Sequence, residues 1–241
     1  MTRGATQAIL QGGIIAAGSG SRLRAEGSRV SKPMVAVAGR PLIEHALDRL
    51  RAAAIRRLTI IINEASDDCR QWLEDHARDL DIDLIVRTTP SSYASFRRVA
   101  DRFAGARAVI TTVDAIMATA DFCGFVSHAA ALPEDIMVLA ATDLVDDENP
   151  LWVTLDPADG SIRRLGGDRG SHVTAGLYVL PAHGLREPAG SFDRLRDYLG
   201  WLLEHGQRMR GIPLPRVYDI DRMHDIAAAE QAAAHGDWSP R

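Results

Sequence analysis

Residues 12–23 of the chain have the sequence GGIIAAGSGSRL, and SKP follows at residues 31–33. The apolar run Ile14–Ala17 has the composition of a buried strand, and the turn after it is rich in Gly and Ser. Glycines let backbone N–H groups approach an anion closely, and Arg22 and Lys32 place two cations beside this turn. The stretch therefore predicts a buried strand that ends in a phosphate-binding loop.

Lys32 is the only lysine among the 28 basic side chains of the chain; all the others are arginine. Lysine carries a compact point charge with rotatable donors, whereas the arginine guanidinium is a planar fork. We interpret the exception as a site that requires an ammonium group.

Size and charge limit the classes of function. A chain of 241 residues fits one large domain or two small ones, and 46% hydrophobic with 25% charged residues is typical of a globular protein. A net charge of −4 argues against nucleic-acid binding and against a polybasic membrane anchor. No apolar run reaches membrane-spanning length, and residues 1–7 lack the apolar core of a signal peptide. We expect a cytoplasmic protein with small-molecule partners, with no nucleic-acid or membrane partner; formation of a homo-oligomer stays open.

Apolar runs and amphipathic segments alternate along the rest of the chain. Strands are predicted, after the first, at residues 58–62, 82–86, 108–113, 136–141, 151–155, 161–165, 173–180 and 209–214. Helices are predicted at residues 41–54, 66–78, 93–103, 121–131, 191–205 and 222–235, and residues 143–150 are expected to form an acidic, turn-rich segment. This alternation predicts an α/β fold with a Rossmann-like, mixed and mostly parallel sheet flanked by helices.

Two candidate features follow predicted strands. The Gly-rich turn comes after the first strand, and Asp114 ends the strand at residues 108–113. Ligands of open α/β sheets bind outside the carboxyl ends of the strands. The loop and the carboxylate are therefore expected to meet in one site.

The segment AAGSGSRL at residues 16–23, with KP at 32–33, resembles the nucleotidyltransferase family that makes NDP-sugars and related activated compounds, within the MobA-like superfamily. Similar family segments are GRPLIEH at 39–45, VTAGLYV at 173–179 and YDIDRMHDI at 218–226. The resemblance implies the nucleotide-diphospho-sugar transferase fold as a single domain over residues 1–241. It also implies an NTP-binding half at about 9–115 and an acceptor-binding half at about 116–235.

The activity implied by the resemblance is transfer of NMP from an NTP to a sugar 1-phosphate or a similar phosphorylated small molecule, with release of pyrophosphate. Its expected catalytic cations are Arg22, which would hold the β- and γ-phosphates, and Lys32, near the α-phosphate. Expected nucleotide-binding residues are Ala16, Ala17, Gly18, Ser19, Gly20, Ser21, Ser91 and Ser92. The cofactor is expected to be Mg²⁺, held by Asp114 with Asp219 or Asp221. Acceptor binding is expected at Thr174 and Gly176.

Some segments depart from the family pattern. The loop at residues 89–95, the strand at 151–154 and the residues 165–168 all lack the usual motifs, which argues against a standard hexose 1-phosphate as the acceptor. The molybdenum-cofactor guanylyl- or cytidylyltransferase branch of the same fold is an alternative, although AAG and SKP favour the sugar-like branch. A non-catalytic sensor of nucleotides or NDP-sugars is a further alternative. A dinucleotide-binding oxidoreductase is disfavoured because Leu23 stands where its third glycine belongs.

Overall fold

The computed structural model describes residues 8–103, 105–145 and 149–239. The polar segment at residues 1–7 lies outside the described residues, as does the 146–148 part of the predicted turn-rich segment. None of the helices in the described ranges has the length and apolarity of a membrane-crossing helix.

Nine strands of the described chain form one sheet, and two short strand pairs lie beside it. The sheet consists of β1 (Gln11–Ala16), β4 (Arg57–Ile62), β5 (Asp81–Val86), β6 (Ala108–Thr112), β8 (Met137–Thr142), β9 (Trp152–Leu155), β10 (Ile162–Leu165), β11 (His172–Val179) and β12 (Met209–Pro213). The short pairs are β2 (Ala36–Val37) with β3 (Arg40–Pro41), and β7 (Ala115–Ile116) with β13 (Tyr218–Asp219). The helices are α1 (Ser21–Ala25), α2 (Leu42–Ala52), α3 (Asp67–His76), α4 (Ser92–Ala100), α5 (Thr119–Ala130), α6 (Leu195–Glu204) and α7 (Met223–Ala234), with 3₁₀ turns η1 (Lys32–Met34) and η2 (Asp101–Phe103).

The strand pairing confirms the predicted fold class. Strand β1 pairs in parallel with β4 and β6, and β5 extends this parallel unit. Strand β11 runs antiparallel to β6, β8 and β9, whereas β8 and β12 are parallel. The result is a mixed sheet in which β11 joins an N-terminal parallel unit to the C-terminal strands.

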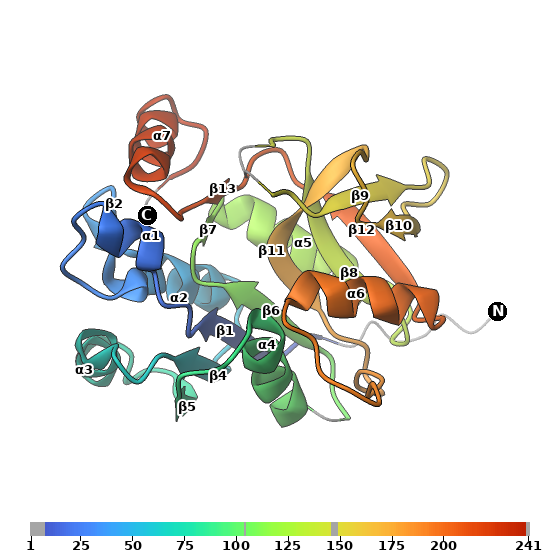
Figure 1. Cartoon of the computed structure of the whole chain (residues 1–241), viewed down its shortest axis with the longest axis horizontal. Coiled ribbons are helices and arrows are strands. Elements are labelled where there is room, and N and C mark those ends of the chain that lie inside the picture. The colour runs from blue at the N-terminus through green and yellow to red at the C-terminus, as the bar shows by residue number, and fades with distance from the viewer. Residues whose placement is uncertain (1–7, 104, 146–148, 240–241) are drawn as a thin grey trace.

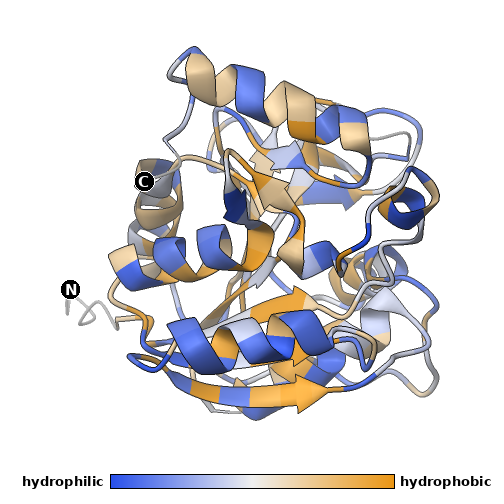
Figure 2. Cartoon of the chain, turned by 90° about the vertical axis from the view of Figure 1, so that its left-hand side faces the viewer, coloured by the Kyte–Doolittle hydropathy of each residue, from blue (hydrophilic) through white to orange (hydrophobic). Residues whose placement is uncertain are grey.

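Helices cover both faces of the sheet, as Figure 1 shows. Helices α4 and α6 pack together on one face, whereas α2 and α5 pack together on the other. The helices alternate polar and apolar residues, and β4 and β5 beneath them are mostly apolar (Figure 2). The buried side chains accordingly form two apolar cores, one on each side of the sheet.

Gly12 and Gly13, the first two residues of the GGIIAAGSGSRL stretch, allow helices to pack closely against β1. A Cβ atom on Gly12 would lie 2.8 Å from Leu50 Cδ2 of α2. On the other face, a Cβ on Gly13 would lie 2.4 Å from Val99 Cγ1 of α4. Both contacts are too short for a real Cβ, so the helices approach β1 closely because it has glycine at these positions.

The structure differs from the prediction at the start of α6 and in two short strand pairs. Helix α6 begins at Leu195 rather than at residue 191, and the Leu195 backbone N–H donates to Ser92 Oγ of α4. The short pairs β2–β3 and β7–β13 were not predicted, because two-residue strands have no periodicity to detect. The β7–β13 pair brings the segment before α7 next to the end of β6.

Candidate active site

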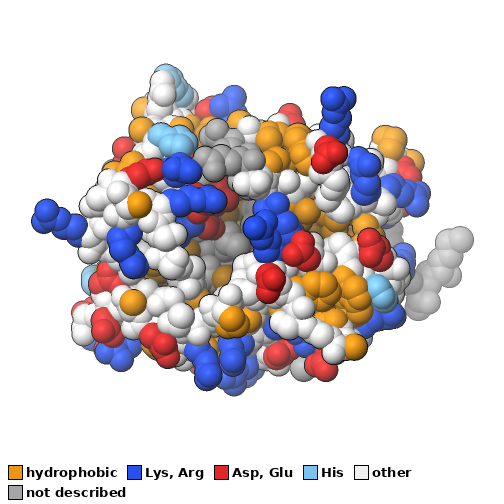
Figure 3. All heavy atoms as spheres, viewed as in Figure 1, with side chains coloured by type: hydrophobic (Ala, Val, Ile, Leu, Met, Phe, Trp, Pro, Cys, Tyr) orange, Lys and Arg blue, Asp and Glu red, His pale blue; other side chains and the backbone are white. Residues whose placement is uncertain are grey.

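A cavity of about 640 Å³ lies at the carboxyl ends of β1 and β6. Figure 3 shows a hollow near the centre of the face drawn there, with acidic side chains inside it and basic ones on both sides. The cavity is lined both by the Gly-rich loop after β1 and by residues of β11 and α6. The N-terminal and C-terminal strands of the sheet therefore contribute opposite walls.

The floor of the cavity comes from a gap beside β11. Strand β6 pairs with β11 from Leu177 onward, and β9 pairs with its start at His172 and Val173. Thr174 and Gly176 lie between these two pairings and line the cavity. Neither β6 nor β9 pairs with Thr174 or Gly176 on this edge of β11, so this part of the strand is open to the cavity.

The Gly-rich loop curves around the mouth of the site. Gly18, Ser19, Gly20 and Ser21 all line the cavity. Gly20 has a φ of +60°, and a Cβ there would lie 3.0 Å from Lys32 Cβ. Because Gly20 has no Cβ, the loop can turn sharply into α1, and Lys32 can pack closely against the loop.

Lys32 lies at the centre of the site. Its Nζ is 2.5 Å from Asp114 Oδ2 and 2.5 Å from Asp221 Oδ1, and only 9% of the side chain is exposed. Burial favours the neutral amine, but the charges of Asp114, Asp219 and Asp221 outweigh it and raise the pKa of Lys32. The group is therefore a buried ammonium between two carboxylates.

Asp114 follows β6 and is held in place by its neighbours. The preceding Val113 N–H donates to the Ile15 carbonyl, which continues the pairing with β1. Burial would raise the pKa of Asp114, but the Lys32 ammonium and a hydrogen bond with Thr112 hold the pKa below its ordinary value. Asp114 is accordingly a carboxylate at neutral pH.

The C-terminal segment supplies the other two carboxylates. Asp219 pairs with Ala115 in the β13–β7 ladder, and the Ile220 N–H donates to the Asp114 carbonyl. The Asp221 N–H donates to Asp225 Oδ2, which fixes the turn into α7. Residues more than 100 positions apart in the sequence are thereby brought to one point.

A set of contacts around Arg22 ties α1 to the same segment. Arg22 Nη1 lies 2.8 Å from Asp221 Oδ2. Glu26 accepts hydrogen bonds from the Met223 N–H and from Arg222. The loop that lines the cavity and the segment that carries the acidic residues are thus held together.

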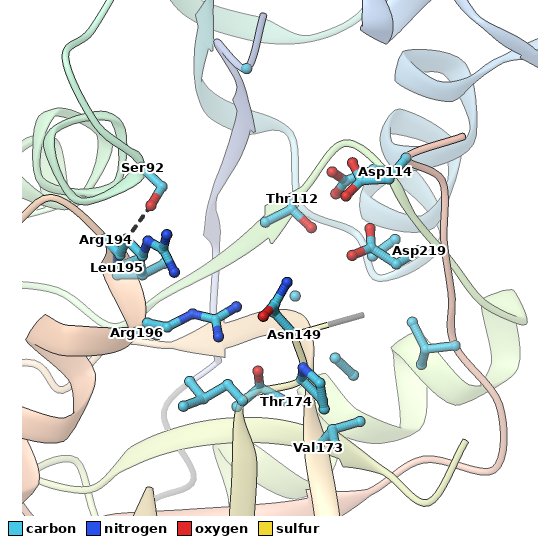
Figure 4. Close-up of a pocket in the computed structure, with 18 of the residues that line it drawn as sticks. Ser92, Thr112, Asp114, Asn149, Val173, Thr174, Arg194, Leu195, Arg196 and Asp219 are labelled. Atoms are coloured by element: carbon cyan, nitrogen blue, oxygen red, sulfur yellow. Dashed lines mark hydrogen bonds between the residues drawn. The ribbon is translucent and has the colours of Figure 1, made fainter. Parts of the chain in front are cut away.

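The opposite wall contains charges that the sequence analysis did not identify. Arg194 and Arg196, at the start of α6, line the cavity together with Asn149 and Tyr178. Figure 4 shows Arg194 and Arg196 across the cavity from Asp114 and Asp219. The sequence gives no clear signal for them, because Asp193 and Asp197 flank the two arginines and balance their charge at the start of the helix.

Three predicted nucleotide-binding residues lie outside the cavity lining. Ala16 and Ala17 are buried at the end of β1, and the Ala17 carbonyl accepts from Asn63. Ser91 is the N-cap of α4: its hydroxyl accepts from the Ala94 N–H and donates to the Phe192 carbonyl. The other predicted residues line the cavity, namely Gly18, Ser19, Gly20, Ser21, Arg22, Lys32, Ser92, Asp114, Thr174, Gly176, Asp219 and Asp221.

Gly176 permits a first prediction. Its φ is +64°, and a Cβ there would lie 2.4 Å from Thr112 Oγ1. We expect Gly176→Ala to lower the free energy of unfolding by at least about 1–2 kcal/mol and to lower activity, since Thr112 hydrogen-bonds with Asp114. Thermal unfolding and turnover measurements check this.

Gly184→Ala is the control, because Gly184 has a φ of +80° but open space around it. Equal effects of both variants, with full activity, would contradict the prediction.

The acidic residues fit a magnesium site that substrate completes. Within the described ranges, no group of three or more His, Cys, Asp or Glu side chains is arranged to hold a metal by itself. Mg²⁺ usually binds one or two carboxylates together with phosphate oxygens. Asp114 and Asp219, adjacent through the β7–β13 pair, offer such a set. Asp114, Asp219 and Asp221 carry three negative charges, whereas Arg22 and Lys32 carry two positive charges. One negative charge therefore remains on this side of the cavity.

Comparison with curated proteins relates the chain to nucleotidyl-transferring enzymes. The chain is 29% identical over 187 residues to CMP-5'-(3-aminopropyl)phosphonate synthase of Streptomyces rubellomurinus, covering 72% of the chain and 28% of that protein. It is 28% identical over 95 residues to mannose-1-phosphate guanyltransferase of Gibberella zeae, covering 39% of the chain and 26% of that protein. The matched segments thus span little more than a quarter of each curated relative.

Solved structures show the same fold at low identity. The inositol-1-phosphate CTP transferase from T. maritima superposes with a TM-score of 0.76 at 17% identity, covering 97% of this chain and 99% of that one. UDP-glucose pyrophosphorylase from Acinetobacter baumanii gives a TM-score of 0.75 at 16% identity, covering 93% of both chains. The model of the MobA-like NTP transferase domain matches residues 12–188. Because this match covers most of the 241 residues, the chain belongs to the MobA-like NTP transferase domain family.

Proposed function

We propose that the protein is a Mg²⁺-dependent nucleotidyltransferase that transfers NMP from an NTP to a small organic phosphate or phosphonate and releases pyrophosphate. The observation that carries the proposal is the Lys32 ammonium, held 2.5 Å from both Asp114 and Asp221 beside a Gly-rich loop. In this proposal residues 1–241 form one domain, in which residues 9–115 bind the NTP and residues 116–235 bind the acceptor.

The reaction brings two anions together, so its main obstacle is electrostatic. An oxygen of the acceptor phosphate or phosphonate forms a bond to the α-phosphorus of the NTP. The bond between that phosphorus and the oxygen bridging to the β-phosphate breaks, and pyrophosphate leaves with its electron pair. The attacking oxygen is already an anion, so no protein group needs to remove a proton. Cations and N–H donors therefore supply the catalysis.

The Gly-rich loop, Arg22, Lys32 and the three carboxylates each have a role in this scheme. Backbone groups of residues 18–21 bind the nucleotide, and Arg22 binds the β- and γ-phosphates. Lys32 neutralises charge that develops on the α-phosphate during transfer. Asp114 and Asp219 would hold Mg²⁺, which when bound neutralises phosphate oxygens. Asp221 orients Arg22 and Lys32, because it contacts both.

The comparisons support a class of acceptor wider than sugars. The Streptomyces relative is named for a product that joins CMP to an aminoalkylphosphonate. The Gibberella relative is named for a sugar phosphate, and it matches a shorter segment of the chain. We therefore propose CTP as the first nucleotide to test and a small phosphonate or phosphate as the acceptor.

The test is pyrophosphate release measured with Mg²⁺, each NTP in turn, and a panel of sugar 1-phosphates, alkyl phosphates and alkylphosphonates. We expect release that requires one NTP, an acceptor and the metal, and that stops when EDTA removes the metal. NTP binding without release for any acceptor would contradict the proposed reaction. Absence of NTP binding would contradict the proposed nucleotide site.

A further inference from the structure

Arg49 is a buried cation that the proposed mechanism does not use. It lies on α2 among the buried apolar residues Ala46, Leu47 and Leu50, and only 2% of Arg49 is exposed. Burial lowers the pKa of Arg49 to about 10, so its guanidinium is still charged at neutral pH. An apolar side chain would occupy this face of the helix at lower cost, because a buried charge loses its hydration. Packing alone therefore does not account for an arginine at this position.

The charge of Arg49 has no ion-pair partner among the described residues. The neighbouring Asp48 pairs instead with Arg40 and Arg51, and its charge offsets the effect of burial on Arg49 only in part. The Nε atom of Arg49 is buried and has no hydrogen-bond partner in the described chain. What holds the guanidinium is a backbone contact, in which Nη2 donates to the Ala115 carbonyl at 2.7 Å.

Ala115 belongs to the short strand that connects the two proposed metal ligands. It follows Asp114 directly and pairs with Asp219 in the β7–β13 ladder. The Ile220 N–H donates to the Asp114 carbonyl, so the hydrogen bonds of this ladder flank the Ala115 pair rather than join it. The Ala115 carbonyl therefore points away from β13 and, because Ala115 is buried, it needs another donor. Arg49 supplies that donor from α2, which packs against β7.

We infer that Arg49 is a positioning residue for the metal site: through the Ala115 carbonyl it fixes where Asp114 and Asp219 place their carboxylates. The inference rests on the proposed function and adds to it a residue that lies outside the cavity lining. Mg²⁺ demands nearly ideal octahedral geometry, whereas Ca²⁺ accepts more varied arrangements of oxygen ligands. A small displacement of β7 is therefore expected to lower the affinity for Mg²⁺ more than the affinity for Ca²⁺.

Arg107 provides a matched control at the other end of β6. It is 3% exposed, its Nε also lacks a partner within the described residues, and its guanidinium donates to the carbonyls of Ala129, Leu132 and Ile136. These contacts hold the end of α5, and Arg107 lies outside the cavity lining. The two arginines thus share side chain, burial and type of acceptor, but of the two it is Arg49 that contacts the strand beside the carboxylates.

Equilibrium dialysis of Mn²⁺ tests the inference without requiring turnover. The full chain is dialysed against Mn²⁺, which can replace Mg²⁺ at oxygen ligands, and α,β-methylene-CTP, which cannot release pyrophosphate. We expect Arg49→Met to weaken Mn²⁺ binding by about tenfold, and Arg49→Lys, which keeps a donor on a shorter side chain, to weaken it less. In competition with Mn²⁺, Mg²⁺ should lose more affinity than Ca²⁺ in both variants. Arg107→Met should leave Mn²⁺ binding unchanged, although it removes three hydrogen bonds and lowers the Tm.

Thermal unfolding of the same samples separates positioning from a general loss of the fold. Weaker Mn²⁺ binding and a lower preference for Mg²⁺ over Ca²⁺ in the Arg49 variants, at a Tm no lower than that of Arg107→Met, support the inference. Unchanged Mn²⁺ binding in a folded Arg49 variant overturns it, as does an equal loss of Mn²⁺ affinity in Arg107→Met or an equal loss of affinity for Mg²⁺ and Ca²⁺. If Arg49→Met does not fold, Arg49→Lys decides between the same outcomes, with Arg107→Lys as its control.

The proposed reaction can fail separately from this inference. Mn²⁺ binding that depends on Arg49, combined with no transfer of NMP to any acceptor, would support the positioning role and count against the reaction alone. Absence of Mn²⁺ binding to the unmodified protein in the presence of the CTP analogue would overturn both the proposed metal site and the role of Arg49.

Discussion

Replacement of Lys32 by alanine is expected to lower kcat by about 10²–10³-fold, while the Kd for NTP changes by less than about tenfold. The reason is the position of the ammonium between Asp114 and Asp221, where its charge is needed most as negative charge moves onto the α-phosphate. Steady-state turnover and equilibrium binding of the NTP, measured on the same preparation, check both parts.

Two further variants sharpen the Lys32 prediction. Lys32→Arg keeps the charge but brings a planar fork to a site that contacts two carboxylates with a point charge, so we expect it not to restore activity. Arg29→Ala, an exposed cation three residues earlier, should leave both kcat and Kd unchanged. An unaltered kcat in Lys32→Ala would refute the assigned role.

The second large effect is expected for Asp114→Asn. The amide has the size of the carboxylate but no negative charge, so Mg²⁺ and the ammonium of Lys32 both lose a partner. We expect turnover to fall by about 10²–10³-fold and the Mg²⁺ concentration for half-maximal rate to rise. Turnover measured across a magnesium titration checks both expectations.

Comparison among the three carboxylates separates metal binding from cation orientation. Asp219→Asn should also raise the Mg²⁺ requirement, because Asp219 neighbours Asp114 through the β7–β13 pair. Asp221→Asn should mainly raise the KM for NTP, because Asp221 holds Arg22 and Lys32. If Asp114→Asn unfolds the protein while its folded fraction retains full turnover, Asp114 is structural and the metal assignment is wrong.

The fold was largely predictable because its strands and helices carry strong local signals. The continuous apolar run at 58–62 became β4, and the Asp-Gly turn at 159–160 joins β9 and β10 as a hairpin. The predicted Gly-rich loop and Asp114 were brought together because they follow parallel strands that end at the same edge of the sheet, whereas Lys32 reaches the same cavity from the turn after α1.

Other features depend on tertiary contacts that no local pattern records. The loop around Ser91 and Ser92 contains two similar hydroxyls, but one caps α4 while the other faces the cavity. Arg194 and Arg196 lie about 80 residues beyond Asp114 in the sequence, and only the packing of α6 against α4 brings them across from it. The proposal of Asp219 rather than Asp221 as a metal ligand likewise rests on the β13–β7 pair and on the contact of Arg22 with Asp221, neither of which a local pattern records.

The central claim, transfer of a nucleotidyl group, is tested most directly by following the fate of labelled phosphorus. CTP labelled at the α-position or at the γ-position is incubated with the protein, Mg²⁺ and 3-aminopropylphosphonate. The account predicts that α-label appears in a new compound containing CMP and the phosphonate, and that γ-label appears in an equal amount of pyrophosphate. Release of γ-label as inorganic phosphate, with no α-label joined to the acceptor, would contradict it.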